Sequence, residues 1–176
     1  NNARKGFLRS PMAFSRVTSG FSLARKHPIF ATWRAHKGVD FGAPTGTPIR
    51  ATASGVVAFA GVQGGYGKAV VLRHDGAVTT LYGHMSRFAS GLKAGTRVSQ
   101  GDVIGYVGQT GWANGPHVHY EFRVGDVARN PQTVALPAAE PVPPAQRAAF
   151  AAAIAPATEM LAAVRHAPRP SLAASD

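Results

Sequence analysis

The sequence predicts a mainly β domain of short antiparallel strands, followed by short C-terminal helices. Short segments rich in Val, Ile, Tyr and Phe recur, Gly and Asp-Gly pairs separate them, and residues 30–136 show no sustained 3.6-residue period. The chain has 176 residues, of which 45% are hydrophobic and 15% are charged. This composition is typical of a globular domain with a packed core and excludes a solvated, disordered chain.

Five segments are the expected strands of this domain. They are Val56–Ala60, Ala69–Arg73, Val78–Tyr82, Val103–Val107 and His117–Val124. The tripeptide His74-Asp75-Gly76 separates the second from the third, and Asp-Gly between two apolar runs predicts a hairpin turn. A four-residue pattern that begins with Gly-Thr and ends with Ile or Val recurs at 46–49 and 95–98, which indicates a duplicated β unit.

The composition changes at Pro137, after which Ala and Pro dominate. We therefore expect one domain over residues 1–136 and a Pro/Ala-rich extension over residues 137–176. Within the extension, Gln146–Ile154 and Ala157–Arg165 are predicted as two short helices. Pro144 and Pro156 can each occupy a first helical turn, and the apolar residues lie three or four positions apart.

The charge is strongly basic and unevenly distributed. The net charge is +11, and residues 1–136 carry 16 Lys and Arg residues against 5 acidic residues. A basic surface attracts polyanions such as nucleic acid, anionic lipid or acidic cell-wall polymers. The basic residues are dispersed and form no evident recognition helix, so nucleic acid is not the expected partner.

Two further classes are excluded by composition. No uncharged apolar run approaches the ~18 residues that span a bilayer, so no transmembrane segment is expected. The chain has no cysteine, which excludes disulfide scaffolds, thiolate nucleophiles and cysteine-based zinc sites.

Three local patterns carry groups suited to chemistry. In an extended chain, His36 and Asp40 share a face, so an imidazole nitrogen and a carboxylate oxygen can point at one ion. His117 and His119 share a strand face for the same reason. His84 ends an apolar strand, where functional sites often lie. Taken alone, each pattern also fits a surface ion pair, solvent-facing histidines or an imidazole bonded to backbone.

Together, the three patterns favour a zinc site. Catalytic zinc takes three protein ligands from His, Asp and Glu and leaves its fourth position for water. Further imidazoles, with pKa values of about 6.5, are suited to carrying that water's proton. The spacing alone leaves His117 and His119 equivalent as ligands.

The motifs resemble those of the lysostaphin/LytM-type zinc metallopeptidases, which cut peptide cross-bridges of bacterial peptidoglycan. The resemblance runs from about Arg16 to Pro131. It is carried by His-x-x-x-Asp, Leu-Tyr-Gly-His-Met and Gly-Pro-His-Val-His-Tyr-Glu-Phe-Arg, in that order. It implies an antiparallel β-sheet with an open substrate groove, of the lysostaphin-like, duplicated hybrid motif type.

The resemblance also implies roles for individual residues. The implied zinc ligands are His36, Asp40 and His119, and the implied catalytic pair is His84 and His117. The residues expected to line the substrate groove are Gly65, Tyr66, Trp112 and Asn114. For the glycine-rich loop at 64–67, an ordinary hairpin turn is an equal alternative. His27 and His74 match family positions that are not ligands.

The implied function is zinc-dependent hydrolysis of peptide cross-links, with peptidoglycan stem peptides and cross-bridges as the partners. A non-catalytic relative that binds peptidoglycan or activates a hydrolase is the main alternative, although such relatives usually lack the ligands present here. A phosphocarrier with two facing histidines is a further alternative, but it gives the His-x-x-x-Asp motif no task. The resemblance further implies export to the periplasm or envelope of a Gram-negative bacterium, and an upstream inhibitory domain.

Overall fold

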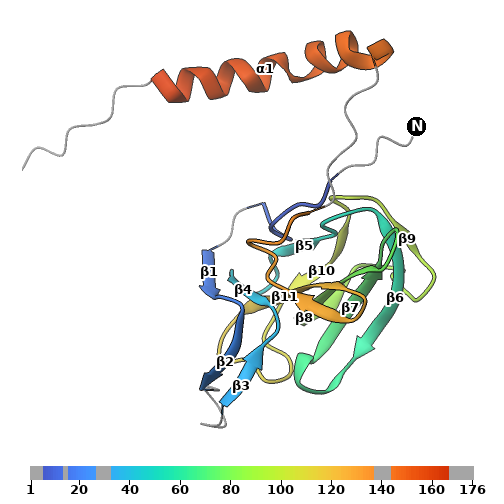
Figure 1. The fold of residues 1–176 in the computed structure, drawn as a ribbon. Coiled ribbons are helices and arrows are strands. Elements are labelled where there is room, and N and C mark those ends of the chain that lie inside the picture. Colours follow the sequence, from blue (N-terminus) through green and yellow to red (C-terminus); the bar gives the residue numbers. More distant parts are fainter. Residues whose placement is uncertain (1–5, 14–15, 27–32, 137–143, 167–176) are drawn as a thin grey trace, which may run out of the picture. The chain divides into compact units, whose positions relative to one another are not determined.

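The structure is a computed structural model that describes residues 6–13, 16–26, 33–136 and 144–166 (Figure 1). By its internal contacts the chain divides into two compact units. One is Arg4–Ala139, and the other consists of Asn1–Ala3 with Glu140–Asp176. None of the helices in the described ranges is both long enough and apolar enough to cross a membrane.

The first unit is built from antiparallel β-strands. They are β1 (Arg16–Ser19), β2 (Ser22–Lys26), β3 (Trp33–His36), β4 (Val39–Gly42), β5 (Pro48–Arg50), β6 (Gly55–Val62), β7 (Lys68–Arg73), β8 (Val78–Phe88), β9 (Arg97–Val98), β10 (Val103–Val107), β11 (His117–Val124) and β12 (Val127–Arg129). Ten of these strands form one sheet in the order β1-β4-β11-β8-β7-β6-β9, in which β10 pairs with β5 and β8, and β12 with β11. Strands β2 and β3 form a separate two-stranded sheet. The predicted mainly β fold is confirmed.

Along β4 and β11, successive side chains point alternately into the hydrophobic core and to the opposite face of the sheet. Val39 and Phe41 of β4 and Val118 and Tyr120 of β11 are buried in the hydrophobic core. The residues between them point the other way because successive side chains of a strand face opposite sides. The central strands therefore fix one apolar face and one face that carries polar side chains.

The expected strands are all present, and the turn at 74–76 joins β7 to β8 as an antiparallel hairpin. Strand β8 is longer than predicted: it passes through His84 and ends at Phe88. The register with β7 shifts there, since Lys68 pairs with Met85 but Val70 pairs with Tyr82. The extra residue on β8 is a bulge, and it lets the strand continue where the sequence suggested an end.

The second unit contains a short 3-10 turn at Pro144–Gln146 and the helix α1 (Arg147–His166). The prediction of two helices separated at Pro156 is wrong, because α1 continues through Pro156. A proline inside a helix removes only one backbone hydrogen bond, although it also crowds the preceding turn. The alanine-rich sequence on both sides is a strong helix former and sustains the helix across this defect.

Candidate metal centre

Three elements bring the proposed ligands together. His36 ends β3, Asp40 lies on β4 and His119 lies on β11. Asp40 and His119 are direct partners in the register of the β4–β11 pair. His36 and Asp40 do not lie on one extended strand as expected, since Lys37 and Gly38 separate β3 from β4. The chain bends at these two residues, and the side chains of His36 and Asp40 still meet.

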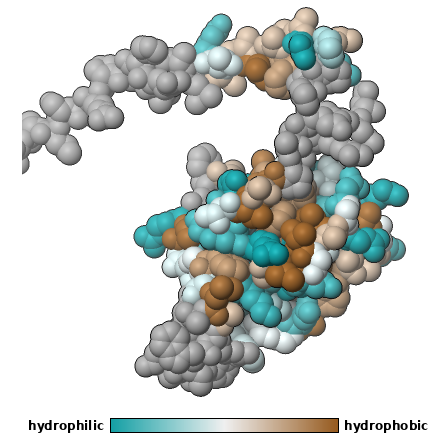
Figure 2. Space-filling model, in the orientation of Figure 1, coloured by the Kyte–Doolittle hydropathy of each residue, from teal (hydrophilic) through white to brown (hydrophobic). Residues whose placement is uncertain are grey.

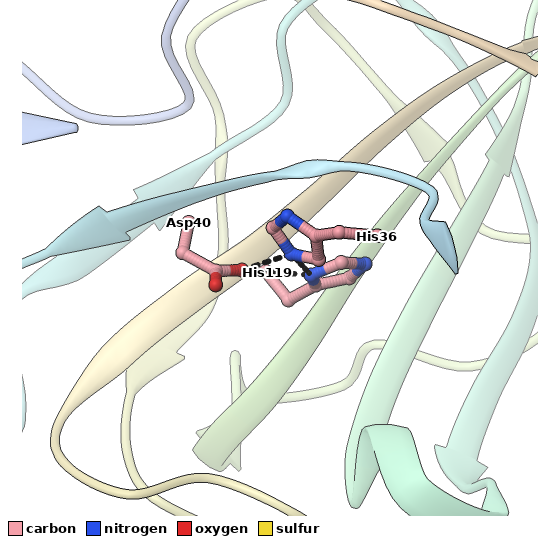
Figure 3. Close-up of side chains that lie close together, drawn as sticks. All are labelled: His36, Asp40 and His119. Carbon is pink, nitrogen blue, oxygen red and sulfur yellow. Dashed lines mark hydrogen bonds and ion pairs between the residues drawn. The ribbon is translucent and has the colours of Figure 1, made fainter. Parts of the chain in front are cut away.

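The three side chains converge on a small volume (Figure 3). His36 Nε2 lies 3.0 Å from Asp40 Oδ1 and 3.1 Å from His119 Nδ1. His119 Nδ1 lies 2.8 Å from Asp40 Oδ1. All three residues are buried. Each side chain therefore offers one atom to the same point.

In each ligand imidazole, the hydrogen bond made by the outer ring nitrogen determines whether the inner nitrogen presents a lone pair or a proton to the cluster. His36 Nδ1 lies 2.7 Å from the Gly20 carbonyl oxygen, which only accepts, so Nδ1 donates its proton there. His119 Nε2 donates to Glu121 Oε1 at 3.0 Å. With these protons placed, each neutral ring presents a lone pair to the Asp40 carboxylate. Three lone-pair atoms at such distances repel one another unless a proton or a metal cation lies among them.

The charges of the cluster favour a cation. Burial alone would raise the pKa of Asp40, but hydrogen bonds with His119 and His36 hold that pKa well below its ordinary value. Burial likewise opposes protonation of His119, yet hydrogen bonds with Asp40 and Glu121 raise its pKa. Asp40 is therefore ionised at neutral pH and attracts positive charge.

The donor set fits zinc. Two imidazole nitrogens and one carboxylate oxygen, without thiolate, are a ligand set of catalytic zinc sites. With bonds of about 2.0–2.1 Å in a tetrahedral site, neighbouring ligand atoms lie roughly 3.3 Å apart. The three candidate atoms are 2.8 to 3.1 Å apart, so only a slight outward movement is required.

Two further imidazoles lie beside the cluster. The ring centroids of His84 and His117 are 4.7 Å apart, and His117 Nε2 lies 3.7 Å from Asp40 Oδ1. His84 Nδ1 donates to the Thr110 carbonyl oxygen at 2.7 Å, and His117 Nδ1 donates to the Gly115 carbonyl oxygen at 2.8 Å. When the rings are neutral, each Nε2 therefore carries a lone pair. Both rings border the cleft described below.

The backbone at His84 is unusual. Its φ of 59° lies in the left-handed region, which non-glycine residues rarely adopt. Such strain persists only where the surroundings hold it, and it often accompanies a functional site. Here the bulge of β8 and the bond to Thr110 hold the ring toward His117. Burial, followed by smaller contributions from neighbouring charges, lowers the pKa of His84 to about 4, so the ring is neutral near pH 7.

A cleft of about 810 Å³ opens over the cluster. All five histidine and aspartate residues singled out from the sequence line it, together with the four predicted groove residues Gly65, Tyr66, Trp112 and Asn114. The backbone N–H of Trp112 donates to the Gly65 carbonyl oxygen at 2.8 Å, and this bond joins the two loops of one wall. The structure thus brings all nine residues to one cleft.

The other histidines lie elsewhere or are not described. His74 is buried between the Ser54 carbonyl and the Thr80 hydroxyl and does not line the cleft. His27 falls outside the described residues.

The sequence interpretation missed Glu121, which is fully buried and bonds to His119. Its position two residues after His119 on a strand was the available signal, because such residues share a face.

An antiparallel sheet whose buried His, His and carboxylate cluster lines an open cleft has the donor set of a metallopeptidase. The chain belongs to peptidase family M23, whose model matches residues 34–131. The resemblance seen in the sequence is thereby confirmed.

Known proteins of this kind are similar to most of the chain. The DD-carboxypeptidase/endopeptidase Mpg of Neisseria meningitidis is 48% identical over 163 residues, which cover 93% of this chain and 37% of the relative. The peptidoglycan DD-endopeptidase ShyC of Vibrio cholerae is 45% identical over 137 residues, covering 78% of this chain and 31% of the relative. The chain therefore spans about a third of the length of these curated relatives.

Solved structures show the same fold. A zinc-containing peptidase from Vibrio cholerae superimposes with a TM-score of 0.70 at 32% identity, covering 76% of this chain and 41% of that chain. The catalytic domain of lysostaphin from Staphylococcus simulans gives a TM-score of 0.60 at 31% identity, covering 67% of this chain and 90% of that chain. The lysostaphin-like fold class is confirmed.

Proposed function

We propose that this chain contains the catalytic domain of a zinc-dependent endopeptidase that hydrolyses peptide cross-links of bacterial peptidoglycan. The observation that supports this most is the convergence of His36, Asp40 and His119 beside two further imidazoles in an open cleft. The similarity to a protein named peptidoglycan DD-endopeptidase supports the choice of substrate.

In this proposal the zinc ion would be held by His36 Nε2, Asp40 Oδ1 and His119 Nδ1. Bound there, it would supply Lewis-acid chemistry, which polarises a peptide carbonyl and makes water a stronger nucleophile at neutral pH. The bond to the Gly20 carbonyl keeps the His36 ring in the tautomer that this role needs.

His84 and His117 are the proposed proton-transfer groups. Their Nδ1–H groups are fixed by backbone carbonyls, so each Nε2 can accept a proton from the attacking water. As the peptide C–N bond breaks, the same proton passes to the leaving amine, and the products are a carboxylate and an amine. Tyr66 and Trp112 border the cleft and are positioned to contact the peptide chain.

The experiment compares digestion of purified sacculi by the wild type and by His84→Ala, His119→Ala and His166→Ala. His84→Ala is expected to keep bound zinc but to lose about 10²- to 10⁴-fold in rate, as is usual for a proton-transfer group. His119→Ala is expected to lose both zinc and activity, while the control His166→Ala keeps both. Equal digestion by all four proteins would reject these roles, and zinc binding without any digestion by the wild type would favour a non-catalytic relative.

The substrate implies a location and a mode of control. We propose that the protein acts in the periplasm or envelope of a Gram-negative bacterium, and that an upstream domain inhibits it by covering the cleft. The support is that the curated relatives are about three times longer than their matched segments. A longer natural form that digests sacculi as fast as this chain would contradict inhibition.

A further inference from the structure

A buried carboxylate contacts the candidate ligand His119 from the side away from Asp40 and has no role in the proton transfers proposed above. Glu121 of β11 has 0% of its surface exposed. Burying a charged carboxylate is costly unless it is paired and hydrogen-bonded. Its partners therefore indicate what the charge is used for.

The two carboxylate oxygens have different partners. Oε2 accepts from Arg123 Nε at 2.7 Å and pairs with Arg123 Nη2 at 2.6 Å. Oε1 accepts from Tyr66 Oη at 2.7 Å and from His119 Nε2 at 3.0 Å. Arg123 thus balances the charge, while the other oxygen contacts one candidate ligand and one side chain of the cleft wall.

A purely structural ion pair would not need this arrangement. Glu121 and Arg123 are two residues apart on one strand and can satisfy each other without His119. The bond from His119 Nε2 does more than neutralise charge, because it assigns the ring proton to Nε2 and leaves Nδ1 as a lone pair. That lone pair lies 2.8 Å from Asp40 Oδ1, on the side of the ligand cluster.

We propose that Glu121 is a positioning residue that fixes the tautomer and orientation of His119 for metal binding. The inference rests on the proposed zinc site but not on the identity of the substrate. Outer partners of ligand histidines commonly change metal affinity by about 10- to 100-fold when they are replaced.

The test substitution is Glu121→Gln, which preserves the shape of the side chain. If the glutamine carbonyl accepts from Arg123, its NH₂ group must face His119 Nε2, which then has to accept. The ring proton would move to Nδ1, where it competes with the metal. Zinc affinity, measured by competition with a chromophoric chelator, is expected to fall about 10- to 100-fold.

Two variants control this measurement. Glu159→Gln makes the same chemical change on the exposed surface of α1 and is expected to bind zinc like the wild type. Tyr66→Phe removes the other bond to Oε1 and is expected to leave zinc affinity close to that of the wild type. Wild-type affinity in Glu121→Gln, or an equal loss in Tyr66→Phe, would overturn the proposal.

A measurement on the zinc-loaded wild type keeps the proposal testable if Glu121→Gln does not fold. Histidine ring ¹⁵N NMR is expected to show His119 with a protonated Nε2 whose proton exchanges slowly with water. An unprotonated Nε2, or a rapidly exchanging proton, would overturn the proposal. A wild type that binds no zinc would instead contradict the proposed function, so the two failures are distinguishable.

Discussion

At the scale of single residues, Gly38 determines how closely the two halves of the ligand cluster approach. A Cβ atom at this position would lie 2.5 Å from the Tyr120 carbonyl oxygen and 2.8 Å from His119 Cε1. The carbonyl belongs to the backbone of β11 and cannot rotate away. Glycine is therefore required here by space, because the chain between His36 and Asp40 passes directly over the His119 ring.

Gly38→Ala is accordingly expected to weaken zinc binding and to reduce the free energy of unfolding by about 1–3 kcal/mol, as overpacking commonly does. Chelator competition and thermal unfolding measure the two effects. Gly61→Ala is the matched control, because the atoms nearest to its new Cβ would be the outer atoms of the Phe59 ring, which can move. Wild-type zinc affinity in Gly38→Ala would contradict this account.

The buried side chain of His74 is expected to make the stability of the protein depend on pH. Burial lowers the pKa of His74 below its ordinary value, and the hydrogen bond to Ser54 and the charge of Asp75 offset this only in part. Between its pKa in the folded protein and about 6.5, the unfolded chain binds more protons than the folded one. The contribution of His74 to stability is therefore complete above about pH 6.5 and is lost as the pH falls below it.

His74→Asn removes this titrating group. We expect the free energy of unfolding of the wild type to decrease more than that of the variant between about pH 7.5 and about pH 5.5. Denaturant unfolding of both proteins in the presence of a metal chelator measures the difference, since zinc release then contributes to neither. Parallel decreases in the two proteins would rule out His74 as the cause.

The residues singled out from the sequence converge in the structure, but the sequence alone could not assign a separate role to each of them. His-x-x-x-Asp and His-x-His identify candidates because their chemistry is local. Equal spacing, however, could not separate His117 from His119, whose nitrogens lie 3.7 Å and 2.8 Å from Asp40 Oδ1. That difference depends on which ring is held by Glu121 and which by the Gly115 carbonyl, and these contacts arise only in the folded protein.

At the scale of elements, the loop between β10 and β11 forms part of the cleft wall and also fixes the position of His84. Thr110 Oγ1 accepts from the Lys68 N–H at 3.0 Å and donates to the Met85 carbonyl oxygen at 2.8 Å, and the Thr110 carbonyl accepts from His84 Nδ1. Thr110 thus connects this loop to β7 and to the adjacent residues His84 and Met85 of β8. The sequence predicted the strands from their apolar residues but not the bulge, which depends on these contacts.

Thr110→Val keeps the shape of the side chain and removes both hydroxyl bonds. The Lys68 N–H then loses its partner, and we expect a loss of about 1–3 kcal/mol in the free energy of unfolding. The displaced bulge is expected to slow sacculus digestion while zinc affinity stays near that of the wild type. Thr158→Val, whose hydroxyl bonds only to the Ile154 carbonyl of α1, is the control, and equal effects of both variants would contradict the prediction.

At the scale of the whole molecule, the division into two units suggests that the β unit functions alone. We propose residues 1–136 as the metallopeptidase domain and residues 137–176 as a separate extension. A protein ending at residue 139 is expected to keep the thermal unfolding midpoint and the zinc affinity of the full chain. A clear loss of either would show that the extension stabilises the β unit.

The excess positive charge predicts how the molecule meets its substrate. Hydrophilic and hydrophobic patches alternate over the face of the β unit shown in Figure 2, so charge can act beside apolar contact. Two of the basic residues of the β unit already have partners: Lys68 bonds to the Ser86 carbonyl, and Arg123 pairs with Glu121. The exposed side chains of Lys37 and Arg73 are therefore expected to contribute more to long-range attraction.

Binding to sacculi is expected to weaken as salt rises, because the screening length falls from about 10 Å at 0.1 M to about 3 Å at 1 M. Pull-down with His84→Ala measures binding without digestion. Adding Lys37→Gln to that background is expected to lower binding at low salt and to have little further effect at high salt. Binding that is insensitive to salt would exclude electrostatic attraction as the cause.

The direct pairing of Asp40 with His119 across β4 and β11 has a consequence for folding accuracy. A slip of one residue between these strands would set Val39 or Phe41 opposite His119 and turn the carboxylate to the wrong side of the sheet. With the ligands proposed above, misaligned molecules would be unable to assemble the ligand set and to retain zinc. The zinc content of a preparation would then report the fraction of molecules in which β4 and β11 pair in the correct register.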